Sequence, residues 1–205
     1  MNIKSILNVF SDVFGKIRKS WELHKYDRFT IAEYFRKQGA QVGENCSIIP
    51  TSIGSEPYLV KIGNHVTIAT DVKFVTHDGG VWLFRDEMPN IHVFGTIIIE
   101  DNCVIGRGAI LMPNIKIGSN SIVASGSVVI NDIPPNSIAI GVPARVLASV
   151  QKYKEKCLTR WEEQKLPDSF FETGLNLWDP KQNKEYRKNL KEHLIKVFWK
   201  ENYKP

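Results

Sequence analysis

A strict six-residue spacing of large aliphatic side chains constrains this chain more than any other feature of its sequence. The spacing runs through Ile99, Ile105, Leu111, Ile117, Val123 and Val129. With such residues at roughly 30% of an average chain, six in register arise by chance on the order of once in a thousand frames. The position four residues further on is mostly small, as at Cys103 and Ala109. A helix would instead place apolar residues at intervals of three and four, so the pattern disfavours one.

A six-residue period is typical of a coil in which each hexapeptide forms one short strand and one tight corner. Three hexapeptides, about 18 residues, make one triangular turn, and the aliphatic side chains point inward and stack between turns. Glycine and asparagine stand near the expected corners, where both tolerate positive φ: Gly106, Asn114, Gly118, Asn120 and Gly126. The period alone does not determine the hand of the coil.

The same register occurs earlier, at Ile62, Ile68 and Phe74 and at Val42 and Ile48. The step from Phe74 to Val93 is 19 residues and not 18, so we expect a loop, residues 77–95, to interrupt the coil. The chain then divides into an N-terminal helical cap (1–39), a β-helix (40–147) and a helical, aromatic-rich C-terminal extension (148–205).

The two ends of the chain have helical patterns. Residues 3–21 carry apolar side chains on one helical face, and we expect this helix to cover the open end of the first coil. Contact with a membrane surface or a partner is the alternative for this face. Two further helices are expected, from Leu147 to about Gln164 and through Leu190 to Trp199, with a break at Pro167.

Composition excludes several classes of protein. Of 205 residues, 42% are hydrophobic and 24% charged, and no stretch approaches the ~20 apolar residues of a membrane span. We expect a cytoplasmic protein, since the start has no signal-peptide pattern. Three cysteines without a CxxC pair predict neither a disulfide framework nor a zinc site. The net charge of +5 comes without a nucleic-acid motif, so we expect no nucleic-acid partner; a solvated surface or attraction of anionic ligands explains it.

Residues 104–147 resemble the hexapeptide acyltransferase superfamily. The runs Asp132-Ile133-Pro134-Pro135-Asn136 and Gly141-Val142-Pro143-Ala144-Arg145 are similar to the end of the β-helix in its galactoside, maltose, serine and capsular-polysaccharide acetyltransferases. The resemblance covers about residues 40–147. It implies a mainly β fold with a left-handed parallel β-helix, a homotrimer with active sites between subunits, and acetyl-CoA as the donor. The loop THDGGVWLFRDEMPN most resembles polysaccharide and sugar O-acetyltransferases, and the short N-terminal segment disfavours the serine branch.

Acetyl transfer to a hydroxyl needs a base, and the unperturbed pKa of histidine, about 6.5, suits that role at neutral pH. The resemblance places the catalytic histidine in the loop between coils, so we assign the base to His77. Asp78 is the first candidate to orient its ring, with Asp71, Glu100 or a backbone carbonyl as alternatives. His92 is the second candidate for the base, and we assign His92 and Asp71 to the acceptor site.

The resemblance also implies a donor site. The positions that match the pantetheine-binding surface are Arg107, Ser125, Ile130 and Asn131, and Arg145 would approach the nucleotide phosphates. Many relatives carry a basic residue in place of Asn131, and many sugar acetyltransferases carry tryptophan in place of Val104. We expect Cys103 to be a buried packing thiol and not a nucleophile, and we expect no metal.

The expected function is acetyl-CoA-dependent O-acetylation of a sugar hydroxyl in a capsule, lipopolysaccharide or related glycan. Other acceptors stay open, namely the amine of a nucleotide-linked amino sugar and an antibiotic hydroxyl. A zinc carbonic anhydrase would need three histidines, but His65, His77 and His92 include no close pair. A non-catalytic scaffold is the remaining alternative.

Overall fold

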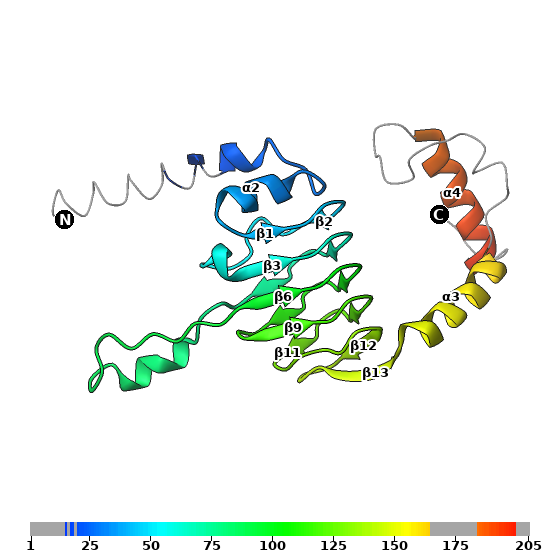
Figure 1. Cartoon of the computed structure of the whole chain (residues 1–205). Helices are drawn as coiled ribbons and strands as arrows, with labels where there is room; N and C mark the ends of the chain where they lie inside the picture. Colours follow the sequence, from blue (N-terminus) through cyan, green and yellow to red (C-terminus); the bar gives the residue numbers. More distant parts are fainter. Residues whose placement is uncertain (1–14, 16, 19, 165–183, 200–205) are drawn as a thin grey trace. The chain divides into compact units, whose positions relative to one another are not determined.

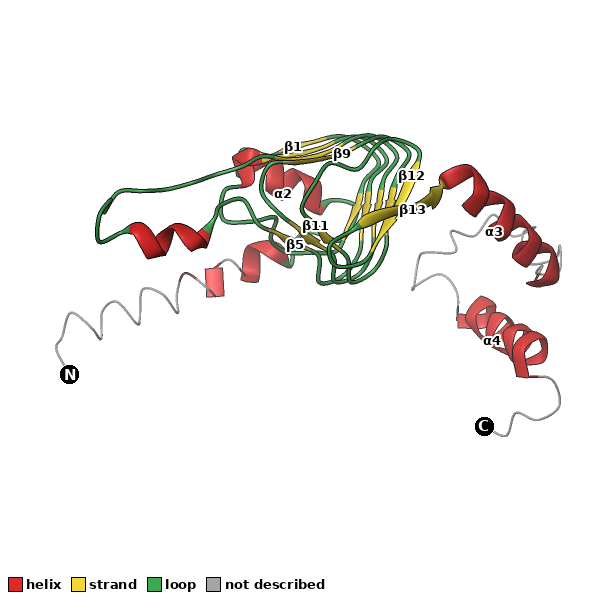
Figure 2. Cartoon of the chain, turned by 90° about the horizontal axis from the view of Figure 1, so that it is seen from below, coloured by secondary structure: helices red, strands yellow, loops and turns green. Residues whose placement is uncertain are grey.

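The repeated hexapeptides form a stack of three-walled coils, which Figure 1 shows from the side and Figure 2 from below. The structure is a computed structural model, and it describes residues 15, 17–18, 20–164 and 184–199. Each wall is a sheet of short strands, and the chain passes from one wall to the next as it winds. A mainly β fold of parallel coils was the expectation from the six-residue period, and it is confirmed.

Strands one coil apart are hydrogen-bonded neighbours in each wall. The first wall consists, in order, of β1 (Gln41–Val42), β3 (Val60–Ile62), β6 (Ile97–Ile99) and β9 (Ile115–Ile117). The second consists of β2 (Ser47–Ile48), β4 (Thr67–Ile68), β7 (Val104–Ile105), β10 (Ile122–Val123), β12 (Ser137–Ile140) and β13 (Arg145–Ser149). The third consists of β5 (Lys73–Phe74), β8 (Ile110–Leu111) and β11 (Val128–Val129). Pairing is parallel throughout except between β12 and β13.

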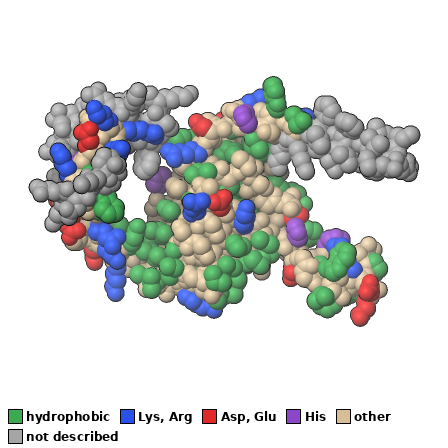
Figure 3. All heavy atoms as spheres, turned by 180° about the vertical axis from the view of Figure 1, so that it is seen from behind, with side chains coloured by type: hydrophobic (Ala, Val, Ile, Leu, Met, Phe, Trp, Pro, Cys, Tyr) green, Lys and Arg blue, Asp and Glu red, His purple; other side chains and the backbone are tan. Residues whose placement is uncertain are grey.

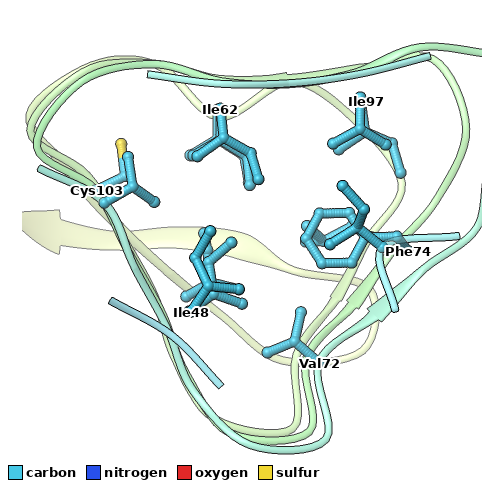
Figure 4. Close-up of a cluster of buried hydrophobic side chains, with 14 of the residues drawn as sticks. Ile48, Ile62, Val72, Phe74, Ile97 and Cys103 are labelled. Carbon is cyan, nitrogen blue, oxygen red and sulfur yellow. The ribbon is translucent and has the colours of Figure 1, made fainter. Parts of the chain in front are cut away.

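The interior of the coils is built from the residues of the six-residue period. All six aliphatic residues from Ile99 to Val129 have no exposed surface. Side chains from all three walls point into this interior, as Figure 4 shows for Ile48, Ile62, Val72, Phe74, Ile97 and Cys103. Each fully buried aliphatic side chain contributes roughly 1.5–3 kcal/mol. The stacked interior is therefore a main source of the stability of the coils.

One turn of the coil contains an insertion. Ile99 pairs with Ile117, 18 positions later, whereas Ile62 pairs with Ile99, 37 positions later, so that turn holds 19 additional residues. Most of this additional length is an arm, residues 78–93, that projects from the coils and contains the 3-10 helix η2 (Gly79–Phe84). Val93 was counted in the repeat, which is wrong, because it is 47% exposed on this arm.

The corners combine left-handed residues with close packing of coils. Asn120 and Gly126 have positive φ, as expected, and so does Asn114. Gly106 and Gly118 do not, which corrects their assignment as left-handed corners. A Cβ on Gly106 would lie 2.5 Å from the Ser125 nitrogen, so glycine is needed there because the next coil approaches closely.

One corner carries a ladder of polar side chains. Asn102 donates from Nδ2 to Asn120 Oδ1 at 2.7 Å, and Asn120 donates to Asn136 Oδ1 at 3.2 Å. At its other end, His65 Nδ1 lies 2.8 Å from Asn102 Oδ1, which is an acceptor, so Nδ1 is the donor. The ladder links successive coils along their outer edge.

The first coil is covered by α2 (Ile31–Lys37), which lies within the expected N-terminal cap (1–39) but after the helix expected over residues 3–21. Phe35 has no exposed surface, and Arg36 donates to the Val42 and Gly43 carbonyls at the start of the coil. Most of the helix expected over residues 3–21 lies outside the described residues. Of its described part, Trp21 is 76% exposed, so α2 and not Trp21 covers the coil.

The chain divides into two compact units, residues 1–151 and 152–205. The second unit contains most of α3 (Val150–Gln164) and all of α4 (Lys184–Trp199). The bounds of these helices are similar to those expected from the sequence. The expected break at Pro167 lies outside the described residues. None of the described helices is both long enough and apolar enough to span a membrane.

Candidate active site

The base of the arm brings His77 to the outside of the third wall. His77 forms an isolated antiparallel bridge with Phe94, and backbone hydrogen bonds from Asp78 to Val93 and from Gly95 to Thr76 close the arm at its base. Both ends of the insertion are thereby tied to the rigid coil. The imidazole of His77 is therefore held by the fold although it lies next to an insertion, and 47% of its surface stays exposed.

A carboxylate binds His77 from a segment that sequence reasoning missed. Glu56 Oε2 lies 3.1 Å from His77 Nδ1, and the same oxygen accepts a short hydrogen bond from the Thr76 hydroxyl. Because a carboxylate only accepts, Nδ1 carries the proton, and the neutral ring presents an unprotonated Nε2. This is the arrangement that a general base requires.

Glu56 is positioned by the irregular first coil. It precedes the 3-10 helix η1 (Pro57–Leu59), and Gly54, two residues earlier, has a φ of 100°. A Cβ on Gly54 would lie 3.1 Å from the Thr76 hydroxyl and 3.3 Å from the Phe74 carbonyl. The 49–56 loop therefore passes tightly over the residues that precede His77, and this contact delivers the carboxylate.

Hydrogen bonding keeps Glu56 ionised. The Thr76 hydroxyl is the largest influence that lowers the pKa of Glu56, and His77 lowers it further, against the opposing effect of burial. Thr76 is only 1% exposed, so its hydroxyl has few alternatives to this carboxylate. A negative charge beside the ring stabilises the imidazolium that forms when Nε2 takes up a proton.

His92 lies close to His77 but has different partners. The rings of His92 and Phe94 are stacked with centroids 6.0 Å apart, and the ring of His77 meets the edge of Phe94 at 6.4 Å. His92 Nδ1 bonds the Asn90 carbonyl at 2.9 Å. Among the described residues no carboxylate pairs with His92, so its geometry favours the base less than that of His77.

His77 lies between two hollows. The coil groove, about 540 Å³, is lined by the 49–55 segment and residues 70–77. The arm hollow, about 450 Å³, is lined by residues of the arm together with Glu56, His77 and Phe94. In Figure 3 the lobe formed by the arm carries hydrophobic and histidine side chains. His77 therefore borders one space with several hydroxyl-bearing residues in its lining and one space with aromatic residues in its lining.

The carboxylates predicted to orient the base have other partners. Asp78 accepts from the Gly80 amide at 2.8 Å and caps η2. Asp71 pairs with Arg107 at 3.3 Å, and Glu100 bonds Lys116 and Ser119. Among Glu56 and these three carboxylates, only Glu56 contacts the His77 ring. Of these, Asp71 lines the coil groove with His77, at a corner where its φ is 64°.

The residues expected at the donor site are distributed over the last coils. Arg107, with 74% of its side chain exposed, follows β7, and Ile130 follows β11 and is 45% exposed. Ser125 follows β10 of the second wall, and Asn131 follows β11 of the third wall. Arg145 begins β13 and donates to the Ala144 carbonyl. These residues are separate from the pair formed by His77 and Glu56.

Cys103 is a buried structural residue, as predicted. It has no exposed surface, and its Sγ lies 3.2 Å from the Gly118 carbonyl. Burial raises the pKa of the thiol, which disfavours a reactive thiolate. Within residues 20–164 and 184–199, histidines, cysteines and carboxylates form no group of three arranged to hold a metal ion.

Comparison with known proteins agrees with this architecture. Residues 96–131 match the family described as bacterial transferase hexapeptide (six repeats). Protein CapG of Staphylococcus aureus is 49% identical over 126 residues, which are 60% of this chain and 73% of CapG. Galactoside O-acetyltransferase of Escherichia coli is 36% identical over 95 residues, 46% of either chain, so less than half of that relative is matched.

A solved hexapeptide-repeat acetyltransferase from Vibrio cholerae shares the fold. The TM-score is 0.52 over 65% of this chain and 87% of that chain, and 24% of the residues are identical. The identity to CapG, the match to the hexapeptide family and the coils built on a six-residue period lead to one conclusion. This chain belongs to the bacterial hexapeptide-repeat transferases, a family of acyltransferase enzymes.

Proposed function

We propose that this chain transfers the acetyl group of acetyl-CoA to a sugar hydroxyl, with His77 as general base and Glu56 as the residue that positions it. The observation that carries the proposal is the hydrogen bond between Glu56 and His77 Nδ1, 3.1 Å long, at the edge of two hollows. It leaves Nε2 free to accept a proton. The galactoside O-acetyltransferase relative supports a sugar as the acceptor.

The reaction follows from this geometry. His77 Nε2 takes the proton of the acceptor hydroxyl while its oxygen attacks the thioester carbonyl carbon. The carbon–oxygen bond forms, the carbon–sulfur bond breaks, and the imidazolium returns its proton to the departing thiolate. Glu56 stabilises the imidazolium between these two transfers. No covalent acyl-enzyme is needed, in keeping with the buried Cys103.

The coil groove supports a polyhydroxylated acceptor. Five hydroxyl-bearing residues line it: Thr51, Ser52, Ser55, Thr70 and Thr76. Hydroxyl groups donate and accept hydrogen bonds, as the hydroxyls of a sugar do. We place the acceptor in this groove, with Asp71 at its far end, and the donor along Arg107, Ser125, Ile130, Asn131 and Arg145.

The proposal includes a left-handed coil and a homotrimer, which the family resemblance implies. The third wall presents apolar side chains outward, at Ile110, Met112, Val128 and Ile130. Large apolar faces of this kind are commonly covered by another subunit. Sedimentation measurements would identify the trimer.

The test compares His77→Ala with His92→Ala by release of free CoA from acetyl-CoA in the presence of a sugar panel. We expect His77→Ala to lose at least ~100-fold in kcat, as removal of a general base does, and His92→Ala to retain most of the rate. Acetyl-CoA binding, followed by calorimetry, should persist in both variants. Loss of activity in His92→Ala but not in His77→Ala would assign the general base to His92. Absence of acetyl-CoA binding by the unmodified protein would favour a scaffold.

Mass spectrometry of the product then determines which atom is acetylated. A product stable to mild base carries the acetyl group on an amine, and a labile product carries it on a hydroxyl. Only the second outcome agrees with the proposal, and the first would assign the chain to amino-sugar N-acetylation.

A further inference from the structure

The residues before His77 alternate strictly between the interior and the groove. Val72, Phe74 and Thr76 are buried, whereas Lys73 and His77 point outward and line the coil groove. In extended backbone, successive side chains on one face are two residues apart. At about 3.3 Å per residue, the Cα atoms of Lys73 and His77 are roughly 13 Å apart. That span exceeds one pyranose ring.

Lys73 is the uncompensated charge of this groove. The other charged side chain in its wall, Asp71, is paired with the Arg107 guanidinium at 3.3 Å. Within the part of the chain that the structure describes, no carboxylate forms a salt bridge with Lys73. Its ammonium group is exposed beside hydroxyl-bearing residues and has three donors to offer. The groove therefore contains, at Lys73, a cation that none of the described carboxylates pairs with.

We propose that the acceptor is an anionic sugar, whose phosphate or carboxylate binds Lys73 while its hydroxyl lies at His77. This inference rests on the acetyltransferase function proposed above and names the acceptor class of the same site. The separation of Lys73 from His77 determines which hydroxyl of a bound sugar reaches His77. Anchoring the anion at Lys73 limits the approach of the sugar to those hydroxyls that lie one ring or more away from the charged group.

The arm hollow offers a different cation. The Arg85 guanidinium lies over the Trp82 ring, with Cζ 5.0 Å from the ring centroid, next to Phe94 and His92. This wall is aromatic, whereas the wall around Lys73 is rich in hydroxyls. Each of the two hollows beside His77 therefore contains a cation, Lys73 in the coil groove and Arg85 in the arm hollow. Replacing Arg85 is the matched control for replacing Lys73.

The experiment compares galactose with galacturonic acid and galactose 1-phosphate, whose anions are a carboxylate and a phosphate. Binding to the enzyme without acetyl-CoA is followed by calorimetry, and turnover by CoA release. We expect a charged sugar to bind about tenfold more tightly than galactose, as a partly exposed charge-assisted contact does. Lys73→Met should remove this advantage and leave galactose unaffected, and Lys73→Arg should retain it. Raised salt should weaken only the charged sugars.

Two further variants make the outcomes decisive. Lys61→Met removes an exposed lysine from the outer face of β3 in the first wall and should change neither binding nor turnover. Arg85→Met should leave the preference for charge intact. Equal binding of neutral and charged sugars by the unmodified enzyme, or loss of the preference in Arg85→Met alone, would overturn the assignment to Lys73. Absence of CoA release with every sugar, despite tight binding of a charged sugar, would contradict the acetyltransferase function and not the anion site.

Discussion

Replacing Glu56 with glutamine isolates the charge beside the proposed base. Glutamine has nearly the same length, and its amide oxygen can accept from both Thr76 and His77, so ring orientation is kept. The negative charge that stabilises the imidazolium is lost. Because the pair is not essential for assembling the coil, Glu56→Gln should fold normally and lose activity.

The size of the loss follows from the geometry. A hydrogen bond to a charged group contributes about 1.5–3 kcal/mol when shielded from water. The His77 side chain is 47% exposed and that of Glu56 15% exposed, so solvent screening reduces the effect to about 1–1.5 kcal/mol. This corresponds to roughly 5- to 12-fold in kcat. Glu56→Ala should lose more, because the ring is also free to change tautomer.

The assay is steady-state CoA release as a function of pH. We expect Glu56→Gln to lower kcat more than it raises KM across the pH range in which the unmodified enzyme is active, because the charge that stabilises the imidazolium is lost. Glu44→Gln is the control, since Glu44 is an exposed carboxylate paired with Arg36 on the first coil. A Glu56→Gln enzyme with the kcat and pH profile of the unmodified protein would refute the positioning role.

Two predictions concern stability, both measured by urea denaturation at fixed protomer concentration. Gly106→Ala should lower the free energy of unfolding by about 3 kcal/mol or more, because its Cβ would lie 2.5 Å from backbone of the next coil. Gly108→Ala should lower it by about 1–2 kcal/mol, because its Cβ meets open space but the backbone φ is 67°. The reverse order would contradict the close-approach argument. The Lys116 ammonium, with Ser119, lowers the pKa of Glu100 from 4.5 to about 2, so its stabilising contribution is present above pH 4.5 and is lost as pH falls toward 2. Glu100→Gln should abolish that part of the acid dependence, and an unchanged acid profile would contradict it.

The coils were predictable because the contacts that stabilise them repeat every turn. Each inward residue, such as Ile105, touches its equivalents one turn away, so one interaction repeats in the sequence and is visible as a period. The partner of His77 was not predictable in this way. Glu56 lies 21 residues earlier, in a loop with no period, and its contact depends on how that loop crosses the wall. Val42 and Ile62 are 20 residues apart and not 18, which was the available sign of an irregular loop.

The glycines at the corners are required for different structural reasons. Gly126 has a φ of 71°, while Gly106 is glycine because another backbone approaches it. A single sequence does not separate these causes, since both appear as glycine in a repeat. The expected cap (1–39) contains the covering helix α2, but its place within the cap was not predicted, because its seven residues are too few to establish a helical period.

The closed base of the arm has a consequence for how such an enzyme diverges. Because each wall residue stacks on one a turn away, gaining or losing one residue inside a strand would turn its inward side chains outward. The arm is under no such constraint, since the bridge between His77 and Phe94 joins its ends whatever lies between them. Residues 78–93 can therefore change in length and composition while His77 keeps its place and its hydrogen bond to Glu56. The lining of the arm hollow can diverge without altering the coil groove.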